Sequence, residues 1–158
     1  MKEVKTNVMR ILDKAKVPYT AHYYDCTDGQ IDGLSVAAKM GQDPDRVYKT
    51  LVTRGASGGF FVFVIPVAGE LDLKAAARAV GEKSVSMLHV NEINSVTGYI
   101  RGGCSPIGMK KQFCTVLDRS VENIPAMIVS GGKKGTQVEL APRDLAGLIS
   151  AKVDAVCV

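Results

Sequence analysis

The spacing of apolar and polar positions predicts several helices. Between Lys2 and Lys16, apolar residues recur every three or four positions with charged residues opposite them, and Pro18 ends the pattern. This segment is expected to form an amphipathic surface helix. The other expected helices cover Ser35–Met40 with Gly41 as its C-cap, Leu73–Val80 between an Asp72 N-cap and Gly81, a short segment from an Asn91 cap to Val96, and Arg143–Ile149 after Pro142.

Runs of β-branched and aromatic residues, bounded by turn residues, predict the strands. Val47–Arg54 and Phe60–Ile65 are separated by a glycine-rich loop, which is typical of a hairpin. Because the second of these runs is apolar throughout, we expect a central strand that is buried on both faces. The remaining expected strands are Tyr19–Asp25, Thr115–Leu117, Ala126–Val129, Thr136–Leu140 and Val153–Val158.

The order of these elements predicts an α+β fold. Neighbouring strands joined by short turns favour a mixed, mostly antiparallel sheet with a closed, barrel-like form and helices around it. The length of 158 residues fits a single domain that spans residues 1–158. The longest apolar run, Phe60–Ala68, contains Pro66 and is too short to span a bilayer, so no membrane role is expected.

Composition adds a weak charge signal and no metal signal. The 20 Lys and Arg against 16 Asp and Glu give a net charge of +4, which is compatible with a polyanionic partner. The four cysteines have no CxxC or CxxH spacing, which argues against a zinc site or a redox pair. Without a recognisable signal peptide, we expect free thiols in a cytoplasmic protein.

Two glycine-rich segments are the first candidates for chemistry. Clustered glycines allow backbone N–H groups to converge on an oxygen or a phosphate. Neither segment has the GxxxxGK[ST] spacing of a P-loop, so a nucleotide triphosphatase is not expected. Each segment alone could be a tight turn, but together, beside lysines, they favour a binding surface. The segments are Gly102–Gly108, followed by Lys110 and Lys111, and Ser130–Gly135, which contains Lys133 and Lys134.

Lys49 is the unusual position in the first hairpin strand. Alternation along the strand places it on the same face as Val47 and Leu51. An ammonium on an inward face needs an anion or carbonyl groups to meet it, and this condition is typical of a functional site. The alternative is that this face is solvated at the strand's end and that Lys49 is an ordinary surface charge.

Other catalytic classes have little support. The chain has only two histidines, His22 and His89, and no GxSxG segment, so a Ser/His/Asp apparatus is not expected. The aspartates between Asp25 and Asp45 lack the spacing of a calcium loop and are expected to form turns and caps. We therefore expect neither a metal nor a cofactor.

Four ordered segments carry a resemblance to a known family, and together they cover nearly the whole chain. They are VYKTLV from Val47 to Val52, PVAGELD from Pro66 to Asp72, GYIRGGCSPIG from Gly98 to Gly108, and SGGKKG from Ser130 to Gly135. The sequence resembles the YbaK/EbsC family, close to its Cys-tRNA(Pro) deacylases. This resemblance implies a mixed α/β domain, related to the editing domain of bacterial prolyl-tRNA synthetases, that removes a misattached amino acid from tRNA.

The resemblance also implies a set of pocket residues. Lys49 is then the central polar residue, with Thr50 beside it, and a pocket tyrosine falls at Tyr23 or Tyr24, of which we choose Tyr24. Gln137 stands where the family's pattern has an acidic residue, so the identity of the amino acid that is removed stays open. The remaining implied substrate-binding residues are Gly102, Gly103, Ser105, Pro106 and Gly108 of one loop and Ser130 and Gly131 of the other.

The expected chemistry is cleavage of the ester between an amino acid and the terminal tRNA ribose. The N–H groups of Gly102 and Gly103, with the Lys49 ammonium, are candidates for stabilising the developing oxyanion. The resemblance implies that the thiol of the substrate cysteine attacks its own carbonyl, which leaves no catalytic role for the protein's cysteines. The residues expected to meet tRNA phosphates are Arg101, Lys110, Lys111, Lys133 and Lys134.

The expected partners are a mischarged tRNA, Cys-tRNA(Pro) or also Cys-tRNA(Cys), and, from the resemblance, prolyl-tRNA synthetase. The protein is expected to be a monomer or a weak homo-oligomer. Two alternatives stay open at this point. One is a deacylase of the same fold that removes alanine or another small amino acid by water attack, and the other is a non-catalytic module that binds tRNA or a synthetase.

Overall fold

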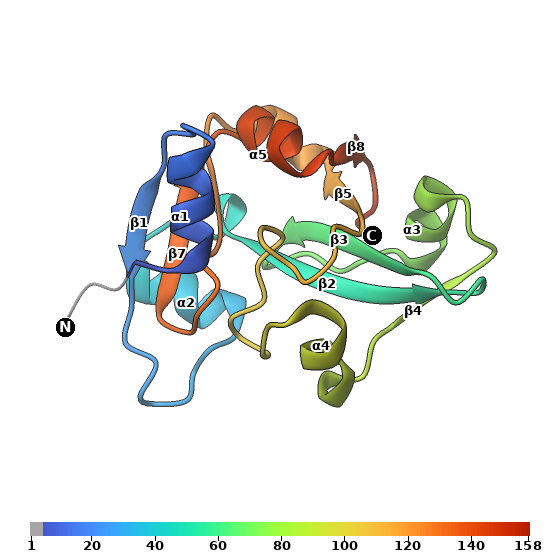
Figure 1. The fold of residues 1–158 in the computed structure, drawn as a ribbon, viewed down its shortest axis with the longest axis horizontal. Helices are drawn as coiled ribbons and strands as arrows, with labels where there is room; N and C mark the ends of the chain where they lie inside the picture. The colour runs from blue at the N-terminus through green and yellow to red at the C-terminus, as the bar shows by residue number, and fades with distance from the viewer. Residues whose placement is uncertain (1–4) are drawn as a thin grey trace.

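The computed structural model describes residues 5–158 and arranges their strands in two sheets (Figure 1). The smaller sheet has the order β1-β7-β6, with both strand pairs antiparallel. Gln137 is paired with His22 on one side and with Ser130 on the other, so these three side chains share one face of the sheet. The strands are β1 (Thr20–Tyr23), β6 (Met127–Ser130) and β7 (Thr136–Leu140).

The larger sheet has the order β4-β2-β3-β5-β8 and mixed strand directions. β2 is antiparallel to β3 and β4, whereas β5 is parallel to β3 and β8. The expected central strand is confirmed, because β3 is the middle strand and its residues 62–65 are buried. The strands are β2 (Tyr48–Gly55), β3 (Phe60–Pro66), β4 (Val85–Met87), β5 (Cys114–Asp118) and β8 (Lys152–Asp154).

The two sheets do not close into a barrel, so the expectation of a barrel-like sheet is wrong. Within the described residues, one isolated parallel bridge, between Val47 and Ile128, links β6 to the chain just before β2. Two residues further along, Lys49 and Ser130 line a cavity instead of extending the ladder. The opening between the sheets is therefore the place where a site can form.

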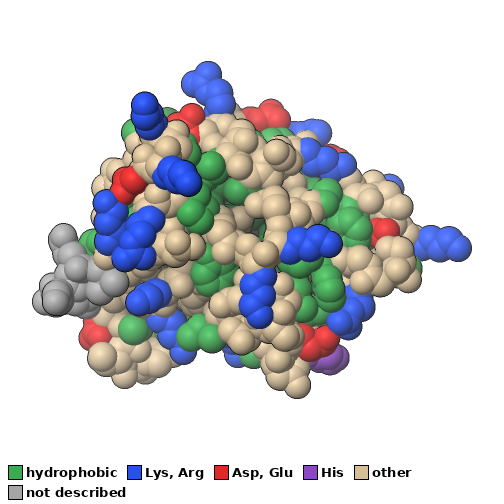
Figure 2. Space-filling model, in the orientation of Figure 1, with side chains coloured by type: hydrophobic (Ala, Val, Ile, Leu, Met, Phe, Trp, Pro, Cys, Tyr) green, Lys and Arg blue, Asp and Glu red, His purple; other side chains and the backbone are tan. Residues whose placement is uncertain are grey.

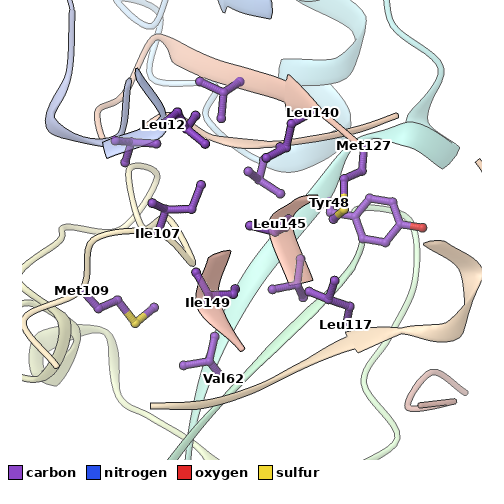
Figure 3. Packing of buried hydrophobic residues seen from close by; sticks show 14 of the residues in the cluster. Leu12, Tyr48, Val62, Ile107, Met109, Leu117, Met127, Leu140, Leu145 and Ile149 are labelled. Atoms are coloured by element: carbon purple, nitrogen blue, oxygen red, sulfur yellow. The ribbon is translucent and has the colours of Figure 1, made fainter. Parts of the chain in front are cut away.

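The main core lies between the two sheets and is closed by two helices, α1 (Asn7–Lys14) and α5 (Pro142–Ile149). Figure 3 shows how Leu12 of α1, Leu140 of β7, Leu145 of α5 and Ile107 of the glycine-rich loop gather in it. Full burial of each such side chain stabilises the fold by about 1.5–3 kcal/mol. The loop at Ile107 is thus anchored by the core.

Two smaller clusters lie on the outer faces of the sheets. α3 (Leu73–Val80) packs its alanines against Phe63 and Ile65 on the larger sheet. α2 (Gly33–Met40) packs Ala37 against Ile128, on the face of the smaller sheet opposite the main core. Further elements are α4 (Val90–Thr97) and the 3-10 turns η1 (Pro44–Arg46) and η2 (Arg119–Asn123).

Capping residues set several helix ends as predicted. Asp72 accepts hydrogen bonds from the N–H groups at the start of α3, and Gly81 and Gly41 end their helices in the left-handed conformation. The Asn91 cap is wrong, because α4 begins at Val90 with His89 as its N-cap and no side-chain hydrogen bond there. The first helix begins at Asn7, and the part of its predicted range before Lys5 lies outside the described residues.

The last two strands differ most from expectation. β4 was not predicted, because its three residues are too few for an alternating pattern. β8 ends at Asp154 instead of continuing to Val158, and the last four residues then make a single bridge within the described chain, from Cys157 to Leu71. Within residues 5–158, no helix combines the length and the apolar character needed to cross a bilayer.

Candidate active site

A small cavity lies where β2 of the larger sheet faces the ends of β6 and β7. Its volume is about 120 Å³, and α2 and the loop before it cover the cavity from outside. We call it the inner pocket. Its polar side chains are Tyr24, Tyr48, Lys49, Thr50, Ser130 and Gln137, and its other walls are Ile31, Gly33, Val36, Val47, Val67 and Gly102.

Three polar atoms of the inner pocket are buried without a hydrogen-bond partner. They are the Tyr24 hydroxyl, Thr50 Oγ1 and Gln137 Oε1, and no other buried side-chain nitrogen or oxygen in residues 5–158 lacks a partner. Each such atom costs about 1–3 kcal/mol when it is left unsatisfied. Their gathering in one cavity indicates a site whose ligand supplies the missing donors and acceptors.

Local structure fixes each of these side chains. Thr50 lies in β2, opposite Val64 of the central strand, and Gln137 lies between β1 and β6. The Tyr24 N–H donates to the Gly135 carbonyl oxygen at 3.0 Å, which ties the tyrosine to the second glycine-rich segment. Of the two candidate tyrosines, Tyr24 lines the pocket, whereas Tyr23 packs against the main core.

Lys49 is half-buried, and its ammonium forms neither a hydrogen bond nor an ion pair with residues 5–158. It lines the inner pocket and also a larger, more open cavity of about 470 Å³. We call the larger cavity the vestibule; Asp32, Leu34, Leu51 and Arg101 lie on its walls. Lys49 therefore stands at the junction of both cavities, as expected for an inward-facing lysine.

Gly102 also belongs to both cavities, and its backbone explains why no side chain is tolerated there. Its φ is +86°, and a Cβ at this position would lie 2.6 Å from Ile31 Cδ1. Its N–H donates to no described residue. The Gly102 N–H thus stays a candidate donor for a ligand oxygen.

The neighbouring Gly103 does not fit the role that was expected of it. Its N–H donates to the Ile100 carbonyl oxygen at 3.0 Å, so it is not free to stabilise an oxyanion. A Cβ on Gly103 would lie 3.3 Å from the Lys133 Cα and from the Lys134 nitrogen. Gly103 instead allows the two glycine-rich segments to pack against each other.

Four other predicted substrate-binding residues shape loops and line neither cavity. Ser105 and Pro106 are buried, and Ser105 Oγ accepts a hydrogen bond from the Ile107 N–H at 3.2 Å. Gly131 is buried as well, and its N–H donates to the Thr136 carbonyl oxygen. Gly108 is exposed, with a φ of +79° beside the Tyr99 hydroxyl. These residues hold the pocket wall in place without contributing to it.

The predicted phosphate-binding residues fall into two groups. Arg101 lines the vestibule, and Lys133 and Lys134 are exposed on the turn that packs against Gly102 and Gly103. Lys110 lies against Gly98 at the end of α4, and Lys111 is exposed beside it. Figure 2 shows Lys and Arg side chains spread over the face in view, with Asp and Glu side chains also present, mostly toward its edges.

The cysteines do not provide an activated thiol to the pocket. All four, Cys26, Cys104, Cys114 and Cys157, are free. Burial raises the pKa of Cys104 to about 11, and burial together with the nearby Asp118 raises the pKa of Cys157 to about 12. Both thiols are neutral at pH 7 and are therefore poor nucleophiles. In the described part of the chain, no group of three or more His, Cys, Asp and Glu side chains could hold a metal ion.

Sequence reasoning missed the apolar half of the pocket. Gly33 begins α2 so close to Val67 that a Cβ would overlap the valine side chain, and Ile31 and Val36 complete this wall. Val67 belongs to the PVAGELD segment that carried the family resemblance, which was the available signal. Asp32 was expected to form a cap, and it does accept a hydrogen bond from the Ser35 N–H.

The fold and this pocket define a protein of the aminoacyl-tRNA editing class. The chain belongs to the aminoacyl-tRNA editing domain family, whose sequence model matches residues 33–148. The chain is also 47% identical, over 148 residues, to an Enterococcus faecalis protein whose name proposes a Cys-tRNA(Pro)/Cys-tRNA(Cys) deacylase, EbsC. That match covers 94% of this chain and 90% of the relative, and it confirms the resemblance drawn from the sequence.

Solved structures show the same fold at lower identity. The hypothetical protein APE2540 superposes with a TM-score of 0.88 at 23% identity, covering 97% of this chain and 100% of its own. A protein proposed as a trans-editing enzyme for prolyl-tRNA synthetase superposes with a TM-score of 0.80 at 21% identity, covering 97% and 98%. Both support the α+β editing-domain fold.

Proposed function

We propose that this protein is a trans-acting deacylase that removes cysteine from mischarged Cys-tRNA(Pro). The observation that carries the proposal is the inner pocket, in which three unpartnered polar atoms and Lys49 surround about 120 Å³. This volume lies below the roughly 300–1,000 Å³ of pockets for drug-sized ligands, whereas the vestibule lies within that range. A small amino acid suits the inner pocket, and the tRNA 3′ end suits the vestibule.

The reaction is cleavage of the ester between the amino acid and the terminal ribose. The cysteine thiol of the substrate loses its proton, and its sulfur attacks the substrate's own carbonyl carbon. The C–S bond forms, the ester C–O bond breaks, and the leaving ribose oxygen takes up a proton. The products are tRNA and a cyclic cysteine thiolactone, which water then opens to free cysteine. No nucleophile of the protein is consumed.

Two groups of the chain are placed to favour this step. The Lys49 ammonium, at the junction of the two cavities, stabilises negative charge on the thiolate or on the carbonyl oxygen. The Gly102 N–H donates to the same oxygen as it becomes anionic. Donors of this kind typically contribute roughly 100-fold to 1,000-fold to the rate. Alanine and proline lack a thiol, so their esters lack the nucleophile.

The exposed Lys133 and Lys134, beside the vestibule residue Gly102, form what we call the rim of the vestibule. They suit the acceptor-stem phosphates, and such contacts carry no sequence information. Selection of tRNA(Pro) therefore falls to a partner, and we propose prolyl-tRNA synthetase for this role. Because tRNA is charged in the cytoplasm, we place the activity there.

The test is deacylation of Cys-tRNA(Pro), Ala-tRNA(Pro) and Pro-tRNA(Pro) by the purified protein and by Lys49→Ala. We expect hydrolysis of the cysteinyl ester alone and a loss of roughly 100-fold or more in Lys49→Ala. Lys74→Ala, which changes an exposed lysine on α3, is the matched control and should retain full activity. Hydrolysis of Ala-tRNA(Pro) would assign the chain to the water-dependent sibling activity, and binding without hydrolysis would indicate a non-catalytic module.

A further inference from the structure

The inner pocket contains a single ionised side chain. Of the residues that line it, only Lys49 is charged, and no carboxylate faces it. Gln137, which forms part of the wall, is a neutral amide. The pocket therefore carries a net charge of +1 before a ligand enters.

Gln137 is held in place but incompletely satisfied. Its backbone lies in β7 between His22 of β1 and Ser130 of β6, and the residue is 7% exposed. Its Oε1 is buried and has no hydrogen-bond partner. An amide oxygen only accepts hydrogen bonds, so the missing partner is a donor. An α-amino group of an aminoacyl ester is such a donor.

The titratable groups around the pocket do not cancel the Lys49 charge. The nearest carboxylate on β7, Glu139, is paired with His22 Nε2 at 2.8 Å. Burial raises the pKa values of Tyr48, which lines the pocket, and of Cys157, and both side chains are neutral at pH 7. Tyr24 also lines the pocket, and the Asp118 carboxylate accepts hydrogen bonds from the N–H groups of Ser120 and Val156. The remaining charged groups, Asp32 and Arg101, lie at the solvated vestibule.

We infer that Gln137 is a specificity-determining residue. Its Oε1 accepts a hydrogen bond from the substrate's α-amino group, and its neutrality leaves the Lys49 charge unbalanced, so that the pocket selects a substrate with a neutral amine and an ionised thiol. This inference rests on the proposed function and adds an electrostatic basis to it.

The consequence is discrimination by charge as well as by reactivity. A nearby positive charge favours the thiolate over the thiol and disfavours the ammonium. A cysteinyl ester can supply the anion that the pocket lacks, whereas an alanyl ester of similar size cannot. A carboxylate at position 137 would balance Lys49 and remove this preference.

The test is the pH dependence of single-turnover Cys-tRNA(Pro) deacylation by wild type, Gln137→Glu and Gln137→Met. In wild type the rate rises with pH as the bound thiol ionises. In Gln137→Glu we expect this rise to move upward by roughly one pH unit or more. The rate at pH 7 then falls about tenfold and recovers at higher pH. Gln137→Met removes the acceptor without adding charge, so it should weaken substrate binding without moving the pH dependence.

The control is Gln112→Glu, which adds the same charge at an exposed position before β5. Its pH profile should coincide with that of wild type. If the profiles of Gln137→Glu and wild type coincide while both proteins unfold at the same temperature, the inference is overturned. A rate lowered equally at every pH in Gln137→Glu would also contradict it, because a merely structural role predicts that result.

A binding measurement separates this inference from the proposed activity. The probe is the stable amide analogue of cysteinyl-adenosine, titrated calorimetrically into both proteins between pH 6 and 9. Wild type should bind it more tightly as pH rises, and Gln137→Glu should lose this dependence. If wild type binds the analogue in this way but releases no cysteine from tRNA, the activity fails and the charge inference stands. If the affinity of wild type does not depend on pH, the charge inference is overturned but the proposed deacylase activity is not. If wild type does not bind the analogue at all, the result contradicts both.

Discussion

The main core and the inner pocket are both buried, but they differ in how they treat polar groups. Beside the main core, the Tyr99 hydroxyl donates to the Ile107 carbonyl oxygen at 2.5 Å, and Thr97 Oγ1 donates to the Ile93 carbonyl oxygen at 2.8 Å. In the inner pocket, Tyr24, Thr50 and Gln137 keep unpartnered atoms. The core is therefore complete without a ligand, whereas the pocket is not.

This difference separates residues that stabilise the fold from residues that serve a ligand. A change in the main core should lower the free energy of unfolding and leave the chemistry of the folded protein intact. Removal of an unpartnered pocket atom should raise the free energy of unfolding, because the empty site no longer buries an unsatisfied polar group. The same change should lower activity, because the occupied site loses a hydrogen bond to its ligand.

The largest expected effect on stability comes from Leu145→Ala in the main core. Leu145 is fully buried on α5 (Figure 3), and its truncation leaves a cavity, so we expect the free energy of unfolding to fall by about 2–5 kcal/mol. Chemical denaturation measures this loss. Leu73→Ala is the matched control, because Leu73 is exposed at the start of α3, and it should change the free energy of unfolding by less than about 0.5 kcal/mol. A Leu145→Ala protein as stable as wild type would show that the core relaxes around the site.

A smaller effect, of opposite sign in the two regions, is expected for a pair of tyrosine substitutions. Tyr99→Phe leaves the Ile107 carbonyl oxygen without its donor and should destabilise the fold by about 1–3 kcal/mol. Tyr24→Phe removes a buried hydroxyl that has no partner and should raise stability by about 1 kcal/mol. Thermal unfolding of both variants and their deacylation rates give the comparison.

The deacylation rates sharpen the same contrast. Tyr24→Phe should lower kcat/KM for Cys-tRNA(Pro) by up to about tenfold, since one hydrogen bond to the substrate is lost. Tyr99→Phe should be nearly as active as wild type at temperatures where it is folded. If Tyr24→Phe proved both less stable and fully active, the Tyr24 hydroxyl would have a partner within the protein, and the contrast between the two regions would fail.

Local signals predicted most of the elements of this fold but not that its two sheets stay open. Asp72 and Gly81 mark the ends of α3 because capping depends on neighbouring residues alone. Whether the sheets close depends on pairing between β6 and β2, which are far apart in sequence. Between the two sheets, the described chain forms only the Val47–Ile128 bridge, and no local sequence pattern indicates that the ladder stops there.

The candidate site was predicted in the same uneven way. Strand alternation and the family resemblance pointed to Lys49, Thr50 and Tyr24, and these residues line the pocket. Gly103 carries the same motif signal as Gly102 but closes a turn on Ile100. Sequence does not distinguish a glycine that faces a ligand from one that admits a neighbouring loop, because the distinction lies in long-range packing.

The smallest expected effect concerns the rim of the vestibule, which belongs to neither buried region. Lys133→Gln with Lys134→Gln removes two charges but keeps the Cγ of residue 134 beside Gly102 and the backbone of both residues beside Gly103. Each phosphate contact contributes roughly 0.7–0.9 to the slope of log affinity against log salt, so the slope for tRNA binding should decrease by about 1.4–1.8. Stability and the rate at saturating tRNA should not change.

The matched control for this rim variant is the exposed pair Lys74→Gln and Lys152→Gln, which lies away from both cavities and changes the net charge equally. Binding measured between 50 and 200 mM KCl, a range over which phosphate contacts are strongly screened, distinguishes local contact from overall attraction. If both double variants lower the slope equally, the rim lysines act only through net charge. A lower slope in the Lys133 and Lys134 variant alone would place the tRNA backbone at the rim and leave the pocket to the chemistry.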